Sequence, residues 1–437
     1  MHSSEARPSV RLRKDDAIFV HAGKVDDKTQ TQTQPRALWR HTDFMLLWSG
    51  QAVSTLGSSV SRLALPLLVL ALTQSPAQAG LIAALQSVPY LVFSLPAGAL
   101  IDRWDRKLVM IRCDVARCLA YGSVPLAYVT AHLSLVQLYA VALVGGTAYV
   151  FFNIAEVAAL PRVVPAEHLS HATALNESAT SASSLIGPGV AGLIISLGRT
   201  TLSGAAVAYL VDSLSYLIST LSLGFIRTPF QAERAPTAGR SLRTEIAEGL
   251  RFLWARRPLR ALALLTMGMN LFFGPLPLAV IVLARTNLHA DARTLGLIFS
   301  AASAGGLLGS LSASWVKARL RVGQAIIGAV AGIAVATPLV AVAPSVPVVL
   351  AGFALVGAML PIYNVVSISY RLHLVPDPLQ GRVNSVFRLL ALGSVPLGTA
   401  LGGLLLGPIG PWVEVWMIAE GEARCAVAVT FTAVRRA

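Results

Sequence analysis

Charge is scarce in this chain, since only 13% of its 437 residues are Asp, Glu, Lys or Arg while 55% are hydrophobic. A water-soluble domain could not hide that much apolar surface in one core, so we expect lipid to surround most of the chain. A helix needs roughly 20 apolar residues to cross a hydrocarbon layer about 30 Å thick, and such runs follow one another through the sequence. The runs are continuous and do not alternate, which argues against a transmembrane barrel and predicts an all-α polytopic membrane protein.

Cysteine and catalytic motifs are also scarce. The three cysteines, Cys113, Cys118 and Cys425, all fall in apolar runs, where we expect small buried hydrophobes and no disulfide framework. The sequence has no phosphate-binding loop of the type G-x-x-x-x-G-K-[ST], no HExxH or Cys/His metal spacing, and no G-x-S-x-G nucleophile motif. We therefore expect no ATP-driven pump, no enzyme, no cofactor and no metal site.

The apolar runs predict six helices before a basic linker and five after it. The first six cover residues 47–72, 79–101, 108–130, 135–159, 172–197 and 201–226. The next five cover residues 259–283, 294–316, 323–342, 346–370 and 383–406. These runs predict an N-terminal bundle over 41–226, a linker over 227–258 and a C-terminal bundle over 259–437 with five or six helices.

A twelfth run, residues 412–434, is the doubtful one. It contains Glu414, Glu420, Glu422 and Arg424, and each ionised residue near the bilayer centre opposes insertion by about 2.5–3.5 kcal/mol. Glu420 and Arg424 are four residues apart and could pair on one helix face. A twelfth crossing would also return the C-terminal arginines to the cytoplasm.

Two segments outside the spans have their own patterns. Residues 1–40 are polar and mixed in charge, which predicts a disordered cytoplasmic tail. The second part of the linker carries an apolar stripe at helical spacing, which predicts an amphipathic helix at the membrane surface. The stripe consists of Ile246, Leu250, Leu253 and Trp254.

The net charge of +14 comes from an uneven distribution of 35 Lys and Arg residues. Three fall in predicted external loops (Arg199, Arg285, Arg293), four at membrane depth (Arg62, Arg117, Arg388, Arg424), and the rest in predicted cytoplasmic segments. This is the positive-inside pattern, so the charge requires no nucleic-acid partner. It predicts a multi-pass protein of the bacterial inner membrane with a cytoplasmic N-terminus, and we expect a monomer.

An internal repeat relates the two bundles. The segment GALIDRWDRK begins at Gly98, and GLLGSLSASWVK begins 208 residues later at Gly306. Pro188 in IGPGVAG is likewise followed 208 residues later by Pro396 in SVPLGTALGG. Two markers at one offset predict two six-helix halves that face each other around a central path.

Four segments of the sequence resemble segments of a known family. GALIDRWDRK resembles the signature loop of the major facilitator superfamily, and LIGPGVAGLI resembles the fifth-helix motif of its drug antiporters. The run QAVSTLGSSVSRLALPLLVLALTQS and the loop VPDPLQGRVNS resemble the macrolide-efflux and enterobactin-exporter branch. The resemblance covers about residues 39–407. It implies twelve helices, alternating access and proton-driven export, usually without an organic cofactor.

The signature loop supplies the candidate gating residues. The resemblance implies a gate in which Asp102 meets an arginine of the eleventh helix, either Arg388 or Arg382; the alternative is that the loop charges only anchor the helices at the inner surface. Asp114 and Arg117 lie three apart and are expected to pair with each other or with the loop. The gating candidates are Asp102, Arg103, Arg106, Lys107, Asp114, Arg117 and Arg388.

Proton coupling has three candidate residues. Glu156 lies near the inner end of the fourth span, while Arg62 and Asp212 lie mid-span at similar depth and are expected to pair. Intramembrane ionisable groups mark relays or substrate paths, although a static ion pair explains the same pattern. A third motif, Gly187, Pro188 and Gly192, is expected to permit a bend and close helix packing. Aromatic residues expected to border an apolar cavity are Phe151, Phe152, Phe272, Phe273 and Tyr363.

Together these observations predict a secondary exporter of small amphipathic compounds, such as drugs, macrolides or siderophore-like metabolites, coupled to protons. Two alternatives remain open at this point. One is a lipid or lysophospholipid flippase on the same scaffold, and the other is a transport-inactive sensor or assembly subunit. The sequence does not distinguish substrates, coupling stoichiometry or transport direction.

Overall fold

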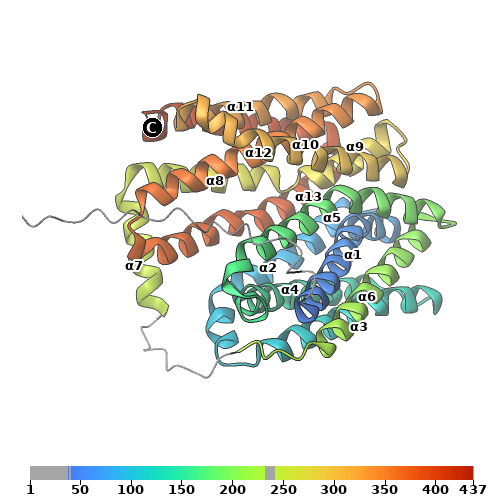
Figure 1. Cartoon of the computed structure of the whole chain (residues 1–437). Helices are drawn as coiled ribbons and strands as arrows, with labels where there is room; N and C mark the ends of the chain where they lie inside the picture. The colour runs from blue at the N-terminus through green and yellow to red at the C-terminus, as the bar shows by residue number, and fades with distance from the viewer. Residues whose placement is uncertain (1–37, 39–40, 232–241, 437) are drawn as a thin grey trace, which may run out of the picture. The chain divides into compact units, whose positions relative to one another are not determined.

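The structure, a computed structural model, describes residue 38, residues 41–231 and residues 242–436. The predicted N-terminal tail and the middle of the linker lie outside the described residues, apart from Leu38. Within them the chain is a series of long helices joined by short turns (Figure 1). The helices of the first part are α1 (Thr42–Thr73), α2 (Pro76–Ile101), α3 (Arg106–Val129), α4 (Leu135–Val163), α5 (Leu169–Leu197) and α6 (Thr201–Phe225).

After the linker the chain continues with seven further helices. They are α7 (Leu242–Ala255), α8 (Arg257–Phe273), α9 (Leu276–Asn287), α10 (Ala292–Arg319), α11 (Val322–Ala341), α12 (Val346–Leu374) and α13 (Asp377–Thr430). Helices α1 to α6, coloured from blue to yellow-green in Figure 1, pack on one another, and α8 to α13, coloured from yellow to red, form a second group. The predicted all-α fold of two six-helix bundles is confirmed. Ten helical stretches of the described residues are long and apolar enough to cross a membrane.

Local capping explains where several helices begin. The Ser75 hydroxyl accepts a hydrogen bond from the Gln78 N–H ahead of α2, and the Asp105 carboxylate accepts one from Leu108 ahead of α3. Asp291 does the same for α10, accepting from the Thr294 N–H at 2.8 Å. Hydrogen bonds from Thr294 hold the pKa of Asp291 below its usual value, because they favour the charged carboxylate.

The predicted seventh span is not one continuous helix. It is divided into α8 and α9 at Gly274 and Pro275. Proline carries no N–H to continue the helical hydrogen bonds, although Gly274 and Pro275 both keep right-handed helical backbone angles. Gly274 lets α13 approach closely, because a Cβ added there would lie 3.0 Å from the Val395 carbonyl oxygen.

The charged twelfth run is a helix that folds back along its own bundle. Gly410, with φ 78° and ψ 160°, interrupts α13 and reverses the chain. The part after the turn lies beside α8 and α11, since Cys425 lies next to Gly268 and the Thr337 hydroxyl donates to Glu422 at 2.7 Å. The predicted Glu420–Arg424 pair is present at 2.6 Å.

The run accommodates its other carboxylates by turning them away from lipid. Glu414 is 3% exposed and Glu422 is fully buried. Helices that carry ionisable groups usually direct them toward the bundle interior, where protein groups replace lipid. The sequence alone could not assign these two side chains to the interior face.

The two bundles touch at glycines near one end of the molecule. Where α2 begins, Gly80 lies against Gly403 of α13, and a Cβ added at Gly80 would lie 2.6 Å from the Gly403 Cα. Where α5 ends and α10 begins, a Cβ added at Gly192 would lie 3.1 Å from the Gly296 Cα. Small residues let helix backbones approach this closely. The start of α2, the end of α5 and the start of α10 therefore close the gap between the bundles.

Candidate functional site

A polar cavity of about 480 Å³ lies between the two bundles. Its walls come from α1, α2, α3, α4 and α6 of the first bundle and from α13 of the second. Gly146 of α4 brings this helix against α2, since a Cβ there would lie 2.1 Å from the Gln86 carbonyl oxygen. The polar and aromatic lining residues are Ser58, Ser61, Arg62, Gln86, Ser87, Tyr90, Arg117, Tyr121, Tyr149, Asn153, Tyr216 and Arg388.

A second cavity, of about 350 Å³, continues from the first. The two share Tyr90, Val150, Asn153 and Arg388. The second also reaches Ser94 near the end of α2 and Ser385 near the start of α13. Both of these helix ends lie opposite the end at which the glycines bring the bundles together. The space between the bundles therefore extends away from the glycine contacts.

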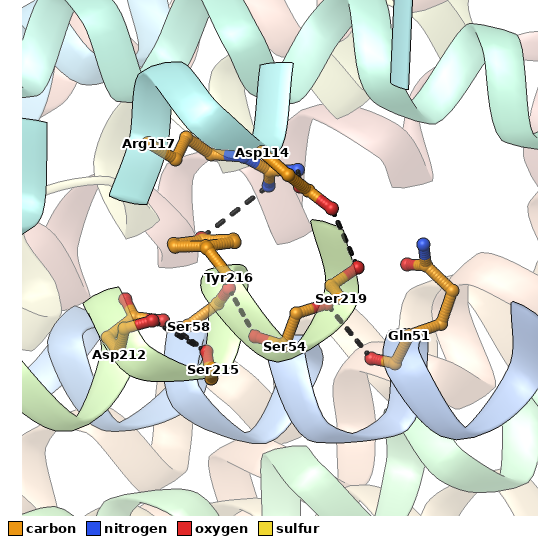
Figure 2. A network of polar contacts seen from close by, with 9 residues as sticks. All are labelled: Gln51, Ser54, Ser58, Asp114, Arg117, Asp212, Ser215, Tyr216 and Ser219. Atoms are coloured by element: carbon orange, nitrogen blue, oxygen red, sulfur yellow. Dashed lines mark hydrogen bonds and ion pairs between the residues drawn. The ribbon is translucent and has the colours of Figure 1, made fainter. Parts of the chain in front are cut away.

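A buried polar network lies behind the cavity wall, between α1, α3 and α6 (Figure 2). Tyr216 shares a hydrogen bond with Ser58 at 2.8 Å, and its hydroxyl also accepts from Arg117 at 3.5 Å. Asp114 accepts from the Ser219 hydroxyl at 2.6 Å. These hydrogen bonds connect residues of the cavity wall to side chains that have no exposed surface.

Arg117 is held from several sides. Its guanidinium pairs with Asp114 at 2.5 Å, which is one of the two arrangements predicted for these residues. Its central carbon lies 4.3 Å from the centre of the Tyr216 ring and 4.6 Å from that of Phe152. Cation–π contacts and an ion pair in a region of low dielectric fix this side chain firmly.

Asp212 lies one side chain behind the cavity. It has no exposed surface and accepts hydrogen bonds from Ser61 and Ser215. The predicted ion pair with Arg62 is not formed among the described residues, because the serine hydroxyls occupy the carboxylate instead. Arg62 borders the cavity and is exposed, and Ser61 separates the cavity from Asp212.

Glu156 borders a smaller neighbouring cavity of about 170 Å³. Its carboxylate accepts a 3.5 Å hydrogen bond from the Asn176 amide of α5. Arg62 and Arg117 border both this cavity and the larger one. The structure therefore brings Glu156 and Arg62 to connected spaces, while Asp212 remains inside the helix packing.

The signature loop joins the helix ends of the first bundle. Asp102 pairs with Arg106 at 3.4 Å, and Arg106 also donates to the Ala158 carbonyl of α4. Lys107 donates to the Ile226 carbonyl after α6, at 2.6 Å. Arg103 is exposed in the same turn. All four loop residues thus contact or face their own half of the molecule.

The predicted gate partners of Asp102 are engaged elsewhere. Arg388 donates a hydrogen bond to the Tyr90 hydroxyl of α2. Arg382 pairs with Glu248 of α7 at 2.5 Å. A pair between Asp102 and either arginine is therefore not formed in this conformation.

The glycine–proline motif of α5 provides close packing on two sides. A Cβ at Gly187 would lie 2.4 Å from the Ser59 Cβ of α1, and Gly192 contacts α10 of the other bundle. The Pro188 carbonyl oxygen would lie 2.5 Å from a Cβ at Gly296. The motif lies where the two bundles meet, outside the lining of the 480 Å³ cavity.

The aromatic lining differs from the prediction. None of the five expected residues borders the 480 Å³ cavity, but Phe151 borders a separate, largely apolar cavity of about 530 Å³ and Phe152 borders the 170 Å³ cavity. Tyr363 shares a 2.5 Å hydrogen bond with Thr266 inside the second bundle. Tyrosines border it instead: Tyr90, Tyr121, Tyr149 and Tyr216. The sequence did contain a signal for the polar wall formed by α1. Ser54, Ser58 and Ser61 are spaced by four and three residues and so mark one polar face of this helix.

Comparisons with known proteins show which family the chain resembles. A family model described as a transmembrane secretion effector matches residues 33–432. The chain is 29% identical over 369 residues to the multidrug efflux pump Tap of Mycolicibacterium fortuitum, covering 81% of this chain and 87% of that protein. It is 24% identical over 393 residues to macrolide efflux protein A of Streptococcus pyogenes, covering 88% of this chain and 94% of that protein.

Solved structures share the fold. A bacterial homologue of the iron transporter ferroportin in its inward-facing state superposes with a TM-score of 0.69 at 18% identity, covering 89% of this chain and 97% of that one. A structure of such a homologue in the outward-facing state gives a TM-score of 0.56 at 18% identity, covering 89% of this chain and 98% of that one. Both similarities concern the fold.

Proposed function

Because the chain belongs to the transmembrane secretion effector family of the major facilitator superfamily, we propose that it exports small amphipathic compounds by alternating access. The observation that carries this proposal is the polar, tyrosine-lined cavity between two bundles that meet through glycines at one end. Transporters of this architecture bind substrate between their halves and rock the halves about that site. The names of the two efflux relatives point to drug-like substrates.

The orientation follows from the charge distribution. With the N-terminus and the basic loops in the cytoplasm, the glycine contacts face outward and the cavity opens inward. The higher TM-score with the inward-facing than with the outward-facing ferroportin homologue, 0.69 against 0.56, supports this assignment. An exporter in this state is ready to load substrate from the cytoplasm or the inner leaflet.

Protons are the proposed coupling ion, and Asp212 and Glu156 are the proposed carriers. Asp212 lies behind Ser61, so a change in the hydration of the cavity wall alters its access to water. Glu156 borders the small cavity with Arg62 and Arg117, where substrate binding would alter its electrostatic surroundings. A carboxylate exchanges protons in a transport cycle when such changes shift its equilibrium between two conformations.

Accumulation assays test this function. Cells with and without the protein are given a panel of fluorescent or radiolabelled amphipathic compounds, before and after a protonophore. We expect lower accumulation with the protein, and we expect the protonophore to abolish the difference. Unchanged accumulation across the panel, with the protein present in the membrane, would reject export and direct attention to movement of a headgroup-labelled lipid in proteoliposomes.

Three variants separate the coupling residues. Asp212→Asn and Glu156→Gln are each expected to abolish the protonophore-sensitive part of export. Glu420→Gln is the control, because Glu420 is exposed and, among the described residues, pairs with Arg424 along its own helix. A Glu156→Gln or Asp212→Asn protein with full gradient-dependent export would eliminate that residue as a proton carrier.

A further inference from the structure

The 480 Å³ cavity has a one-sided charge. Three arginines border it, Arg62, Arg117 and Arg388, while no aspartate or glutamate from the described part of the chain lines it. The nearby carboxylates lie elsewhere: Asp212 is fully buried behind Ser61, and Glu156 borders the neighbouring small cavity. A ligand in the main cavity therefore meets guanidinium groups and hydroxyls.

The three arginines differ in how far they are neutralised. Arg117 is paired with Asp114 and is 5% exposed, so its charge is largely neutralised within the protein. Arg62 is exposed and forms no ion pair among the described residues. Arg388 is also exposed, and among the described residues it contacts the hydroxyl and the ring of Tyr90, which carry no formal charge. Two guanidiniums are thus left to attract an anion.

The second bundle strengthens this positive character near Arg388. Arg371 of α12 is 7% exposed, donates to the Asn384 side chain at 2.9 Å and lies 4.0 Å from the centre of the Phe387 ring. None of these partners is an acid. Ionisable groups at membrane depth usually pair with an opposite charge or mark a substrate path, and the described residues supply no opposite charge for Arg388.

We propose that the cavity selects amphipathic organic anions, with a carboxylate, sulfonate or phenolate group held between Arg62 and Arg388. The apolar ring system of the ligand packs against Tyr90, Tyr121 and Tyr149, which border the same space. Guanidinium groups bind carboxylates and related oxyanions through charge-assisted hydrogen bonds. This inference rests on the proposed function, since it names the substrate class of the export cavity.

The two arginines lie on different bundles, so a bound anion also affects the conformation of the protein. Arg62 lies on α1 of the first bundle and Arg388 on α13 of the second. An anion bound by both arginines attracts both bundles. A ligand shifts a conformational equilibrium only as far as it binds one conformation more tightly than the other. Binding between Arg62 and Arg388 therefore favours the conformation in which the open end closes over the ligand.

A matched pair of dyes tests the charge preference. Carboxyfluorescein and rhodamine 123 share a xanthene ring system but carry opposite charges. Binding of each to the purified full-length protein in nanodiscs is measured by fluorescence anisotropy, at constant ionic strength. We expect the anionic dye to bind at least about tenfold more tightly. Equal or tighter binding of the cationic dye, or binding of neither, would overturn the inference.

Substitutions identify the arginines responsible. Arg388→Gln and Arg62→Gln should each weaken binding of the anionic dye by about tenfold or more, which is the scale of one charged hydrogen bond, and leave the cationic dye unaffected. Arg388→Glu should reverse the preference. Arg424→Gln is the matched control, because Arg424 pairs with Glu420 and does not border the cavity. Equal weakening of both dyes by Arg388→Gln would indicate damaged packing and contradict the assignment.

Transport of the same dyes separates this inference from the function on which it rests. In inside-out vesicles with an imposed proton gradient, we expect uptake of the anionic dye. Gradient-driven uptake of the cationic dye alone would leave the exporter intact and overturn the anion site. Tight binding of the anionic dye without gradient-driven uptake would leave the site intact and overturn the exporter.

Discussion

Asp114 is the residue that keeps Arg117 in place beside the cavity. The carboxylate has no exposed surface, lies 2.5 Å from the guanidinium and accepts a second bond from Ser219. Arg117 in turn stacks on the ring of Tyr216, which lines the cavity. A residue predicted as part of a gate therefore supports the binding surface through a chain of buried contacts.

Removal of this carboxylate should be strongly destabilising. Asp114→Ala leaves the Arg117 guanidinium buried without its counter-charge, and breaking a buried pair in this way typically costs about 3–5 kcal/mol. Thermal unfolding of the detergent-purified protein measures the loss, with Ser219→Ala as the milder comparison at about 1 kcal/mol. Equal stability of Asp114→Ala and the parent protein would show that Arg117 finds another partner.

At the scale of the element, α13 shows how one residue divides a long apolar sequence into two antiparallel helices. Gly410 has φ 78°, a region that favours glycine, and prolines 408 and 411 flank it. The turn lets the last helix lie along α8 and α11, so that Glu422 reaches Thr337. The packing of the charged run therefore depends on the backbone freedom of Gly410.

Gly410→Ala is expected to destabilise the protein by about 1–3 kcal/mol, because alanine is strained at this φ. Gly407→Ala is a close control: a Cβ there meets no atom within 4 Å, and the residue is helical without a positive φ. Chemical unfolding of both variants measures the difference. A loss at Gly407 as large as that at Gly410 would contradict the conformational explanation.

At the scale of the whole molecule, glycines determine how closely the two bundles approach. Gly192 and Gly296 meet where α5 ends and α10 begins, while Gly80 and Gly403 meet where α2 begins. Conformational change between two states of a transporter requires such interfaces to separate. The contacts therefore stabilise the conformation described here against its alternative.

Gly296→Val should shift the equilibrium toward the conformation in which this end is open. A Cβ at Gly296 would lie 2.5 Å from the Pro188 carbonyl oxygen, so the bundles cannot keep their present approach. Distances between spin labels across the outer ends of α5 and α10 should lengthen. Gly328→Val on α11 is the control, since a Cβ there meets no atom within 4 Å, and its distances should equal those of the parent.

Much of the architecture followed from local patterns, because lipid imposes simple requirements. Continuous apolar runs predicted the helices, and the Glu420–Arg424 spacing predicted their pair. The predicted Asp114–Arg117 contact also lies within one helix turn, where sequence spacing determines distance. The burial of Glu422 did not follow, since it depends on Thr337 of a neighbouring helix.

The sequence by itself determined the class of protein, the approximate limits of most of its helices and the repeat that relates its halves, because hydropathy and periodicity are local properties of the chain. Only the tertiary structure decided which charged groups meet. It gave Asp212 two serines as partners and left Arg62 facing the cavity with Arg388 of the other bundle. Depth along a helix can be read from sequence, but the neighbour of a side chain depends on helix rotation and on the approach of distant segments.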